Sequence, residues 1–316
     1  MLFRALFLLP ACAVIAGAQT RFDFESVQMA TKFRLSLHAE TRQAAERAAD
    51  EAFARVAALT AVFSDYEPQS ELSRLCAAPH GVPFASSHDL QALVSRAQEI
   101  SRLTDGAFDI TCGHVSRLWR SMRTRKRVPP PERVAEARAR MDWRAVAIDP
   151  ANKTITLKNP GMLLDVGGIA KGYAADAVLR LLREKHGITR ALVIAGGDIA
   201  AGDAPPDEAE GWEVKLRTFA APIGSGAEKL ESIRLKNAAV STSGDLYRSA
   251  TVDGKSYAHI ISPQTGLGLT DLMPCSVIAP DATTSDALAT ALCVLGREKG
   301  NPIAARFPGV TVRWGR

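Results

Sequence analysis

The chain has 316 residues, of which 47% are hydrophobic and 23% charged, so it can bury a sizeable core as a folded soluble protein. Its net charge of +5 would suit an anionic ligand, although such a charge is also common without one. The densest basic cluster, Arg120 to Arg127, has no interleaved aromatic residues and runs into three prolines, which is typical of a solvated loop and excludes an ordinary nucleic-acid-binding segment.

The first 18 residues have the pattern of a secretory signal. A positively charged start precedes an apolar run from Ala5 to Ile15, and the small residues Ala16-Gly17-Ala18 follow. The apolar run is too short to span a bilayer, so we expect cleavage after Ala18. A competing pattern, Leu9-Pro10-Ala11-Cys12, resembles a lipoprotein cleavage box and would anchor the chain through Cys12. Both patterns predict an exported, periplasmic protein.

Helical patterns dominate the first half of the mature chain. After a strand over Thr31–Leu37, apolar residues recur at helical spacing in four stretches. These are Thr41–Phe63, a helix from Ser86 or Ser87 to Leu103, Val115–Met122, and Glu132–Arg140.

The second half alternates strands and turns around two further helices, Ile169–His186 and Asp286–Leu295. Strands are expected at Ala145–Ile148, Thr154–Leu157, Met162–Val166, Leu192–Ala195, Trp212–Leu216, Ser232–Leu235, Ser256–Ile261, Cys275–Ile278 and Val310–Val312, with loops at 202–210 and 220–229. Helices that gather early and hairpins that come late indicate an α+β fold with largely antiparallel, mixed sheets. We expect a single domain over residues 19–316.

The segment Leu164-Asp165-Val166-Gly167-Gly168-Ile169-Ala170-Lys171-Gly172 is predicted to run from a strand through a glycine turn into a helix. The glycines allow the backbone to approach a ligand closely, and a helix start suits phosphate. Lys171 would add a positive charge, and Asp165 could accept from a ribose or a flavin N–H. The spacing fits neither common nucleotide-binding glycine pattern. An ordinary turn with a solvated lysine is the alternative.

The segment Thr283-Thr284-Ser285-Asp286-Ala287-Leu288-Ala289-Thr290 places Asp286 and Thr290 four residues apart on one helical face. A carboxylate and a hydroxyl on one face suit Mg²⁺ rather than zinc. The alternative is that Thr283 and Asp286 form a helix-capping box.

Three further segments are weaker signals by themselves. His259 lies at the end of a strand before a Pro-x-x-Gly turn, where it could be an acid–base group or a buried structural histidine. Gly106-Ala107-Phe108-Asp109 offers an aromatic ring and a carboxylate, and Gly196-Gly197-Asp198 follows a strand.

Together these segments resemble the ApbE family, the FAD:protein FMN transferases. The resemblance runs in order through Met29-Ala30-Thr31, Phe63-Ser64-Asp65-Tyr66, Gly106 to Asp109, Asp165 to Gly172, Gly196-Gly197-Asp198, His259 to Gly266 and Ser285 to Thr290. It implies a transferase that splits FAD, moves FMN onto a Thr or Ser hydroxyl of an acceptor redox protein, and releases AMP. It also implies association with the inner membrane.

The same resemblance implies residue roles. The FAD site would be lined by Met29, Tyr66, Ala107, Phe108, Asp109, Asp165 and Lys171, with Cys275 as a further flavin contact. Mg²⁺ would be held by Asp286, Thr290 and the backbone carbonyl of Gly168, and His259 or a nearby carboxylate would assist the incoming hydroxyl. Two positions depart from the family's pattern: Ala30 stands where relatives often have Gly, and Ile194-Ala195 precede the Gly-Gly-Asp segment.

Two other functions stay open on the sequence. A FAD pyrophosphatase would use the same site with water as the attacking group and would yield FMN and AMP. A non-catalytic periplasmic protein would bind FAD and leave it intact.

Overall fold

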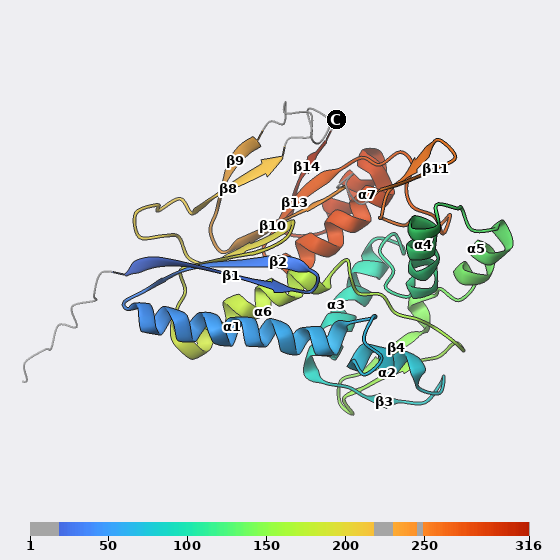
Figure 1. Cartoon of the computed structure of the whole chain (residues 1–316), viewed down its shortest axis with the longest axis horizontal. Helices are drawn as coiled ribbons and strands as arrows, with labels where there is room; N and C mark the ends of the chain where they lie inside the picture. The colour runs from blue at the N-terminus through green and yellow to red at the C-terminus, as the bar shows by residue number, and fades with distance from the viewer. Residues whose placement is uncertain (1–18, 218–229, 245–248, 316) are drawn as a thin grey trace, which may run out of the picture.

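The computed structural model describes residues 19–217, 230–244 and 249–315. The expected signal, the Cys12 anchor and the expected loop 220–229 lie outside the described residues. The chain forms a long molecule with a sheet and helices over most of its length and a smaller helical region at one end (Figure 1). Mixed helices and antiparallel sheets confirm the α+β prediction.

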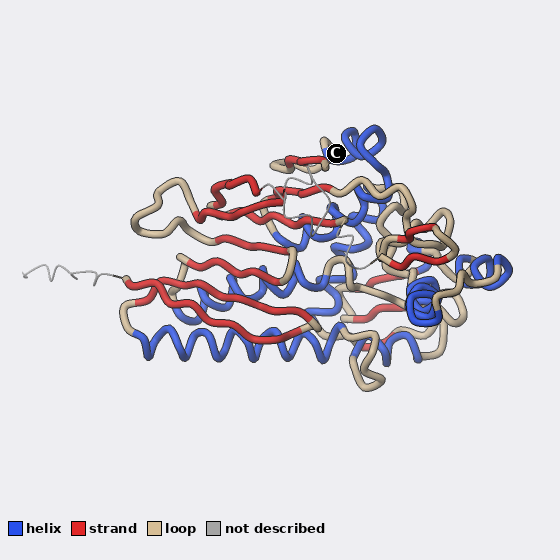
Figure 2. The backbone as a smooth tube through the Cα atoms, turned by 45° about the horizontal axis from the view of Figure 1, so that its top comes forward, coloured by secondary structure: helices blue, strands red, loops and turns tan. Residues whose placement is uncertain are grey.

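The central element is a seven-stranded sheet in which every neighbouring pair is antiparallel. Its strands, in spatial order, are β1 (Thr20–Gln28), β2 (Thr31–Ala39), β6 (Ala191–Ala195), β7 (Asp198–Ala201), β10 (Ala238–Ser243), β13 (Cys275–Ala279) and β14 (Thr311–Trp314). Figure 2 shows these strands side by side, with the long helix α1 (Arg42–Phe63) along one face.

Both faces of the sheet are covered. Successive side chains of a strand point to opposite faces, and here they enter two different hydrophobic clusters. Val193 and Ala200 face the large core with α1, α6 (Ala170–His186) and α7 (Ala282–Ala304). Leu192 and Ile199 face the other way, toward the hairpin of β8 (Trp212–Arg217) and β9 (Leu230–Leu235).

The smaller region carries the remaining elements, which pack beyond the end of α1 (Figure 1). They are α2 (Glu71–Ala77), α3 (His88–Leu103), α4 (Gly113–Arg125), α5 (Pro131–Arg138), a 3-10 turn at Trp143–Ala145, the sheet of β3 (Phe84–Ala85), β5 (Thr154–Leu157) and β4 (Val146–Asp149), and the hairpin of β11 (Ala250–Val252) and β12 (Lys255–Tyr257).

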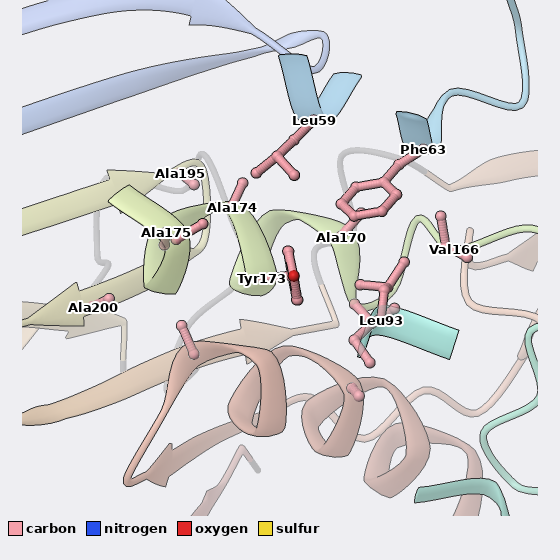
Figure 3. Close-up of a cluster of buried hydrophobic side chains, with 14 of the residues drawn as sticks. Leu59, Phe63, Leu93, Val166, Ala170, Tyr173, Ala174, Ala175, Ala195 and Ala200 are labelled. Carbon is pink, nitrogen blue, oxygen red and sulfur yellow. The ribbon is translucent and has the colours of Figure 1, made fainter. Parts of the chain in front are cut away.

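Small side chains let α6 lie close to its neighbours. Figure 3 shows Ala174 and Ala175 of α6 beside Leu59 of α1 and the alanines of β6 and β7. The helix ends in a left-handed residue, Gly187, whose N–H bonds to the Arg183 carbonyl at 3.2 Å, as helix C-termini commonly do. The alanine face thus places the start of α6 next to the sheet.

Several sequence-based boundaries are wrong, for local reasons. Met162–Val166 is not a strand. Only Leu163 forms an isolated β-bridge, to Cys112, because this largely buried apolar run has no neighbouring strand along its length. Helix α4 continues to Arg125, so the basic residues expected in a loop are partly helical. Helix α7 begins at Ala282, four residues before the expected Asp286. None of the described helices is long and apolar enough to cross a membrane.

Candidate active site

Two tight turns meet at one end of the seven-stranded sheet. The β1–β2 turn holds Met29 and Ala30 at positive φ, 47° and 55°, the backbone geometry of a two-residue hairpin turn. The β6–β7 turn beside it has Gly196 at φ 67°, where a Cβ would lie 3.0 Å from the Thr31 hydroxyl oxygen. The predicted Met29 and Gly196-Gly197 segments therefore share this end of the sheet.

A buried charge cluster lies at the start of α6. The ammonium of Lys171 pairs with the carboxylate of Asp198, the first residue of β7, and lies 3.5 Å from the Asp286 Oδ2 of α7. The side chains of Asp198 and Asp286 are each only 4% exposed. One cation thus stands between two carboxylates that have little contact with water.

Backbone proximity explains why Asp286 faces α6. A Cβ on Gly172 would lie 2.1 Å from the Ala282 carbonyl oxygen, so only glycine fits where the two helices meet. The Gly172 N–H donates to Asp286 Oδ2 at 3.0 Å. The two sequence segments, at 164–172 and 283–292, therefore meet, as the sequence-based hypothesis requires.

The start of α7 is capped without Asp286, so the capping alternative is wrong. The N-cap is Asp281, whose Oδ1 accepts from the Thr284 N–H at 2.7 Å. Asp176 of α6 accepts from the N–H groups of Ala282 and Thr283, each at 2.8 Å. These two carboxylates satisfy the free N–H groups of the helix start, so the cap does not require Asp286.

Burial sets the protonation of the cluster. It raises the pKa of Asp286, and the negative charge of Asp198 raises it further. For Lys171 burial opposes the charged form, but the two carboxylates outweigh it and raise its pKa. Two carboxylates thus share one lysine, and a further cation beside Asp286 would stabilise its charged form.

Gly168, Thr290 and Phe108 come together beside this cluster. A Cβ on Gly168 would lie 3.2 Å from the Thr290 hydroxyl oxygen and 3.3 Å from the Phe108 ring. The predicted metal ligands of α7 and of the glycine turn thus lie close to one another. Their carboxylate, hydroxyl and carbonyl oxygens are the hard donors that suit Mg²⁺.

Within the described residues, no group of three or more His, Cys, Asp or Glu side chains is placed to hold a metal. A cation at this cluster would therefore depend on hydroxyl and carbonyl oxygens as well as carboxylates. This donor set fits Mg²⁺, which keeps several waters when it binds to proteins, better than it fits zinc.

A second charge cluster surrounds Arg120 of α4, a residue that the sequence did not single out. Its guanidinium lies 2.5 Å from Asp65 and 3.1 Å from Asp165. It also stacks over the Tyr66 ring, 4.3 Å from the centroid. Tyr66 is 72% exposed, so its outer face is open to a planar ligand.

This second cluster orders the glycine turn. Asp165 Oδ1 accepts from the Gly167 N–H at 2.9 Å, while its Oδ2 binds Arg120. Burial raises the pKa of Asp65, nearby Asp165 raises it further, and Arg120 partly offsets both. Because the Asp165 carboxylate bonds both to the Gly167 N–H and to Arg120, the conformation of the glycine turn is fixed before any ligand binds.

The loop Ala107-Phe108-Asp109 is held from within. Asp109 accepts from the Thr111 N–H at 2.8 Å and from the Thr111 hydroxyl at 2.7 Å. Burial raises the pKa of Asp109, although these hydrogen bonds partly offset it. The Ala107 and Phe108 side chains are buried, and Phe108 reaches Gly168 as described above.

His259 lies on a hairpin that packs against α4 and α5. The Ala258 N–H donates to the Leu269 carbonyl at 2.8 Å, and a Cβ on Gly268 would lie 3.2 Å from Trp119 of α4. His259 is half-buried. Its predicted catalytic role stays a prediction.

Cys275 lies in the core against α7, where it contacts the residue before Thr290. The residue is fully buried. Its thiol lies 3.9 Å from the Cys293 sulfur and 3.6 Å from the Ala289 carbonyl oxygen. Its first position in β13 turns the side chain into the large core. The expected contact with a flavin stays a prediction.

Sequence reasoning missed three residues that organise the site. Asp198 was noted only as the end of a weak Gly-Gly-Asp segment, yet it pairs with Lys171. Arg120 was counted in a solvated basic run, and Asp176 has the appearance of an ordinary helical residue. The pairing of Asp198 with a lysine 27 residues earlier could have been found only by placing β7 beside α6.

The arrangement suits reactions at a phosphate. Oxygen donors around Lys171 provide a cation site that can hold a phosphate through the metal, and an exposed aromatic ring stacks on Arg120 in the second cluster. Such a site can bind a nucleotide through its diphosphate and a ring system together.

Comparison with known proteins supports this interpretation. The sequence pattern of the ApbE family matches residues 29–314. A FAD:protein FMN transferase of Treponema pallidum (strain Nichols) is 36% identical over 284 residues, which cover 85% of this chain and 77% of that protein. A Haemophilus influenzae protein of the same name is 31% identical over 255 residues, or 78% of this chain and 72% of that protein.

Solved structures agree with the sequence matches. The apo form of the Pseudomonas stutzeri flavinyl transferase ApbE superposes with a TM-score of 0.81 at 28% identity, covering 94% of this chain and 91% of that one. The flavin transferase ApbE from Vibrio cholerae also superposes with a TM-score of 0.81, at 26% identity and 93% coverage of both chains.

Proposed function

The chain belongs to the ApbE family, as the sequence resemblance predicted, and from this premise we propose that it is an FAD:protein FMN transferase. It cleaves FAD, joins FMN to the hydroxyl of a Thr or Ser in an acceptor redox protein, and releases AMP. The acceptor hydroxyl oxygen forms a bond to the FMN phosphorus, the bond from that phosphorus to the bridging oxygen breaks, and the hydroxyl proton passes to a base.

One observation carries this proposal above the others. The glycine segment and the helix segment with Asp286 and Thr290 are over a hundred residues apart, yet the Gly172 backbone lies directly against the Ala282 carbonyl and the Gly168 backbone lies beside the Thr290 side chain. This close approach brings the Gly168 turn, Asp286 and Thr290 to one place, where their oxygens can serve a single ligand. The joint oxygen donors therefore support a cation site at the diphosphate.

We propose that Asp286, Thr290 and the Gly168 carbonyl hold Mg²⁺. Bound there, Mg²⁺ would neutralise the negative charge that develops on the phosphoryl oxygens. Lys171 adds a fixed positive charge beside the same oxygens, and the N–H groups at the start of α6 add their dipoles. These residues hold the diphosphate in line for attack, which supplies much of the rate in phosphoryl transfer.

The ring end of FAD is assigned to the Arg120 cluster and the loop beside it. Tyr66 offers an exposed ring for stacking, and Met29, Ala107, Phe108 and Asp109 complete the expected set of contacts. Asp165 accepts from a ring N–H, with its orientation fixed by Arg120. His259 stays our proposed group for the acceptor hydroxyl.

The test is an FAD assay with purified full chain, Mg²⁺ and candidate redox proteins that carry Thr or Ser. We expect AMP release together with flavin fluorescence that stays on the acceptor in a denaturing gel, and neither product when EDTA removes the metal. FMN released without a labelled acceptor would show an FAD pyrophosphatase instead. Intact FAD in the presence of Mg²⁺ would show a protein that only binds flavin.

We also propose export to the periplasm, with residues 19–316 forming a single domain. The support is the signal pattern of residues 1–18 and the competing lipoprotein box at Cys12. Cell fractionation with a Cys12→Ala variant distinguishes the two. If the unchanged protein associates with the membrane and the Cys12→Ala variant does not, the lipid anchor is established. If the unchanged protein stays in the cytoplasm, export is refuted.

A further inference from the structure

The positive charge of this chain is concentrated in one short segment. Residues 117–144 contain ten Lys and Arg but only three Asp and Glu, a net charge of +7. The whole chain carries +5, so all residues outside this segment together carry a net −2. The mild positive charge of the protein is therefore a local property of α4, α5 and their connection.

The centre of this segment presents free charges to solvent. Arg123, Arg125, Lys126 and Arg127 are all exposed, and within the described residues none of them forms an ion pair. Of the acids in the segment, Glu136 pairs with Arg140 at 2.9 Å rather than with any of these four residues. We call these four exposed cations the basic face.

A helix dipole does not account for the basic face. Cations in the last turn of a helix stabilise it by roughly 0.3–1 kcal/mol each, and Arg123 and Arg125 lie in that turn. Lys126 adopts a left-handed conformation after the helix, with φ 53°, and Arg127 follows it. The charge thus continues beyond the helix end, into a connection stiffened by Pro129 and Pro130 before α5, which itself begins with Pro131.

The basic face is joined to the candidate active site on two sides. Arg120, one turn before Arg123 in α4, binds Asp65 and Asp165. Arg138 of α5 donates to the Pro263 carbonyl at 3.2 Å, on the hairpin that carries His259. A protein whose hydroxyl enters the site would therefore pass beside α4 and α5.

The face also lies far from the start of the described chain. Figure 1 shows α5 at one end of the long axis, and β1 begins at the other. A membrane tether at the beginning of the chain would leave the basic face at the distal end. This arrangement favours a protein partner over lipid headgroups.

We propose that the basic face docks the acceptor protein through an acidic surface next to the acceptor's Thr or Ser. This inference rests on the proposed transferase function and adds the electrostatic character of the second substrate. Charge complementarity of this kind raises association rates by about 10- to 1000-fold at low salt and suppresses wrong partners. The predicted acceptor site is therefore rich in Asp and Glu around the modified residue.

The experiment uses two fluorescent peptides as probes. One carries a central Thr flanked by Glu on both sides, and the other has Gln at each Glu position. Binding to the full chain is measured by fluorescence anisotropy at about 50 mM and about 500 mM salt, where charge screening differs strongly. The variant R123Q/R125Q/K126Q/R127Q removes the basic face, and R47Q/R102Q/K158Q/K299Q removes four exposed cations elsewhere.

We expect the Glu peptide to bind at least about tenfold more tightly than the Gln peptide at low salt, and about equally at high salt. The basic-face variant should lose this preference, and the matched control variant should keep it. Equal binding of the two peptides to the unchanged protein would overturn the proposal. Equal loss in both variants would do so too, because it would show only an effect of overall charge.

Two further measurements separate related outcomes. Vesicles with one quarter phosphatidylglycerol test the lipid alternative: if they bind through the basic face while the Glu peptide does not, the surface is a membrane contact and the proposal fails. AMP release from FAD at saturating acceptor should stay within about twofold in both variants, since none of the eight residues is assigned to the active site. If the unchanged protein cleaves no FAD, the proposed function fails, while the peptide preference is still measured independently.

Discussion

Two clusters with the same formal composition, two aspartates and one cation, lie on either side of the glycine turn. In the first, Lys171 stands between Asp198 and Asp286, whose side chains are 4% exposed. In the second, Arg120 bridges Asp65 and Asp165, each 18% exposed, and stacks on Tyr66. The charges match, but the geometry of the cations does not.

The difference teaches which cluster can accept a ligand cation and which one shapes a pocket. An ammonium is a compact point charge that makes no fixed planar contacts, so Asp286 can turn its remaining oxygen to a metal. A guanidinium holds its carboxylates in a fork of fixed geometry and presents its flat face to an aromatic ring. The lysine cluster is therefore suited to binding and the arginine cluster to positioning.

The largest expected effect tests the lysine cluster as a metal site. Asp286→Asn should lower the rate of AMP release by about 1000-fold, because a lost metal ligand removes several kcal/mol of transition-state stabilisation. FAD affinity, followed by flavin fluorescence, should change only a few-fold. Asp281→Asn is the matched control, since Asn caps a helix as well as Asp. Full activity in Asp286→Asn would refute the metal assignment.

The next effect concerns stability. Lys171→Met leaves two buried carboxylates without their cation, which costs about 3–5 kcal/mol. Thermal unfolding should show this loss, and Mg²⁺ should recover more of it in the variant than it adds to the unchanged protein. If Mg²⁺ shifts both melting temperatures equally, the lysine cluster does not bind the metal.

Arg120→Lys tests whether the second cluster depends on shape rather than charge. The variant keeps the positive charge but loses the fork and the stacking on Tyr66, so FAD affinity should fall about tenfold, or about 1.4 kcal/mol. Arg117→Lys, at an exposed position one turn earlier in α4, is the control and should leave the affinity unchanged. An unchanged FAD affinity in both variants would mean that the second cluster depends only on the positive charge at residue 120.

The smallest effect uses a half-buried carboxylate, Asp176, for which the described residues show no ion pair. Burial raises the pKa of Asp176 to about 6, so the folded state binds this proton more tightly than the unfolded state does. Stability from this group is therefore gained as the pH falls from 7 to 5, by about 1 kcal/mol. Urea unfolding should show a larger gap between the unchanged protein and Asp176→Asn at pH 5 than at pH 7. A constant gap would mean that the pKa is unperturbed.

The sequence by itself determined most of the secondary structure and the identity of the two key segments. Hydrophobic periodicity predicted the long helices, because a buried helix face repeats every three to four residues whatever it packs against. Glycine spacing at 167–172 marked a close backbone approach, and Asp286 with Thr290 marked a helical face. These features are local, so they are visible in a linear chain.

Only the tertiary structure decided which charged residues form ion pairs with one another. Asp198 joins Lys171 because β7 lies beside α6, and Arg120 reaches Asp165 because α4 packs across the glycine turn. The choice between a cap and a ligand for Asp286 depended on where α7 begins, four residues earlier than the periodicity indicated. The side chain of Cys275 points into the core because of its position in β13. In a strand, a shift of one residue decides which face of the sheet a side chain takes. Electrostatic partners far apart in sequence leave no local pattern, and only folding brings them together.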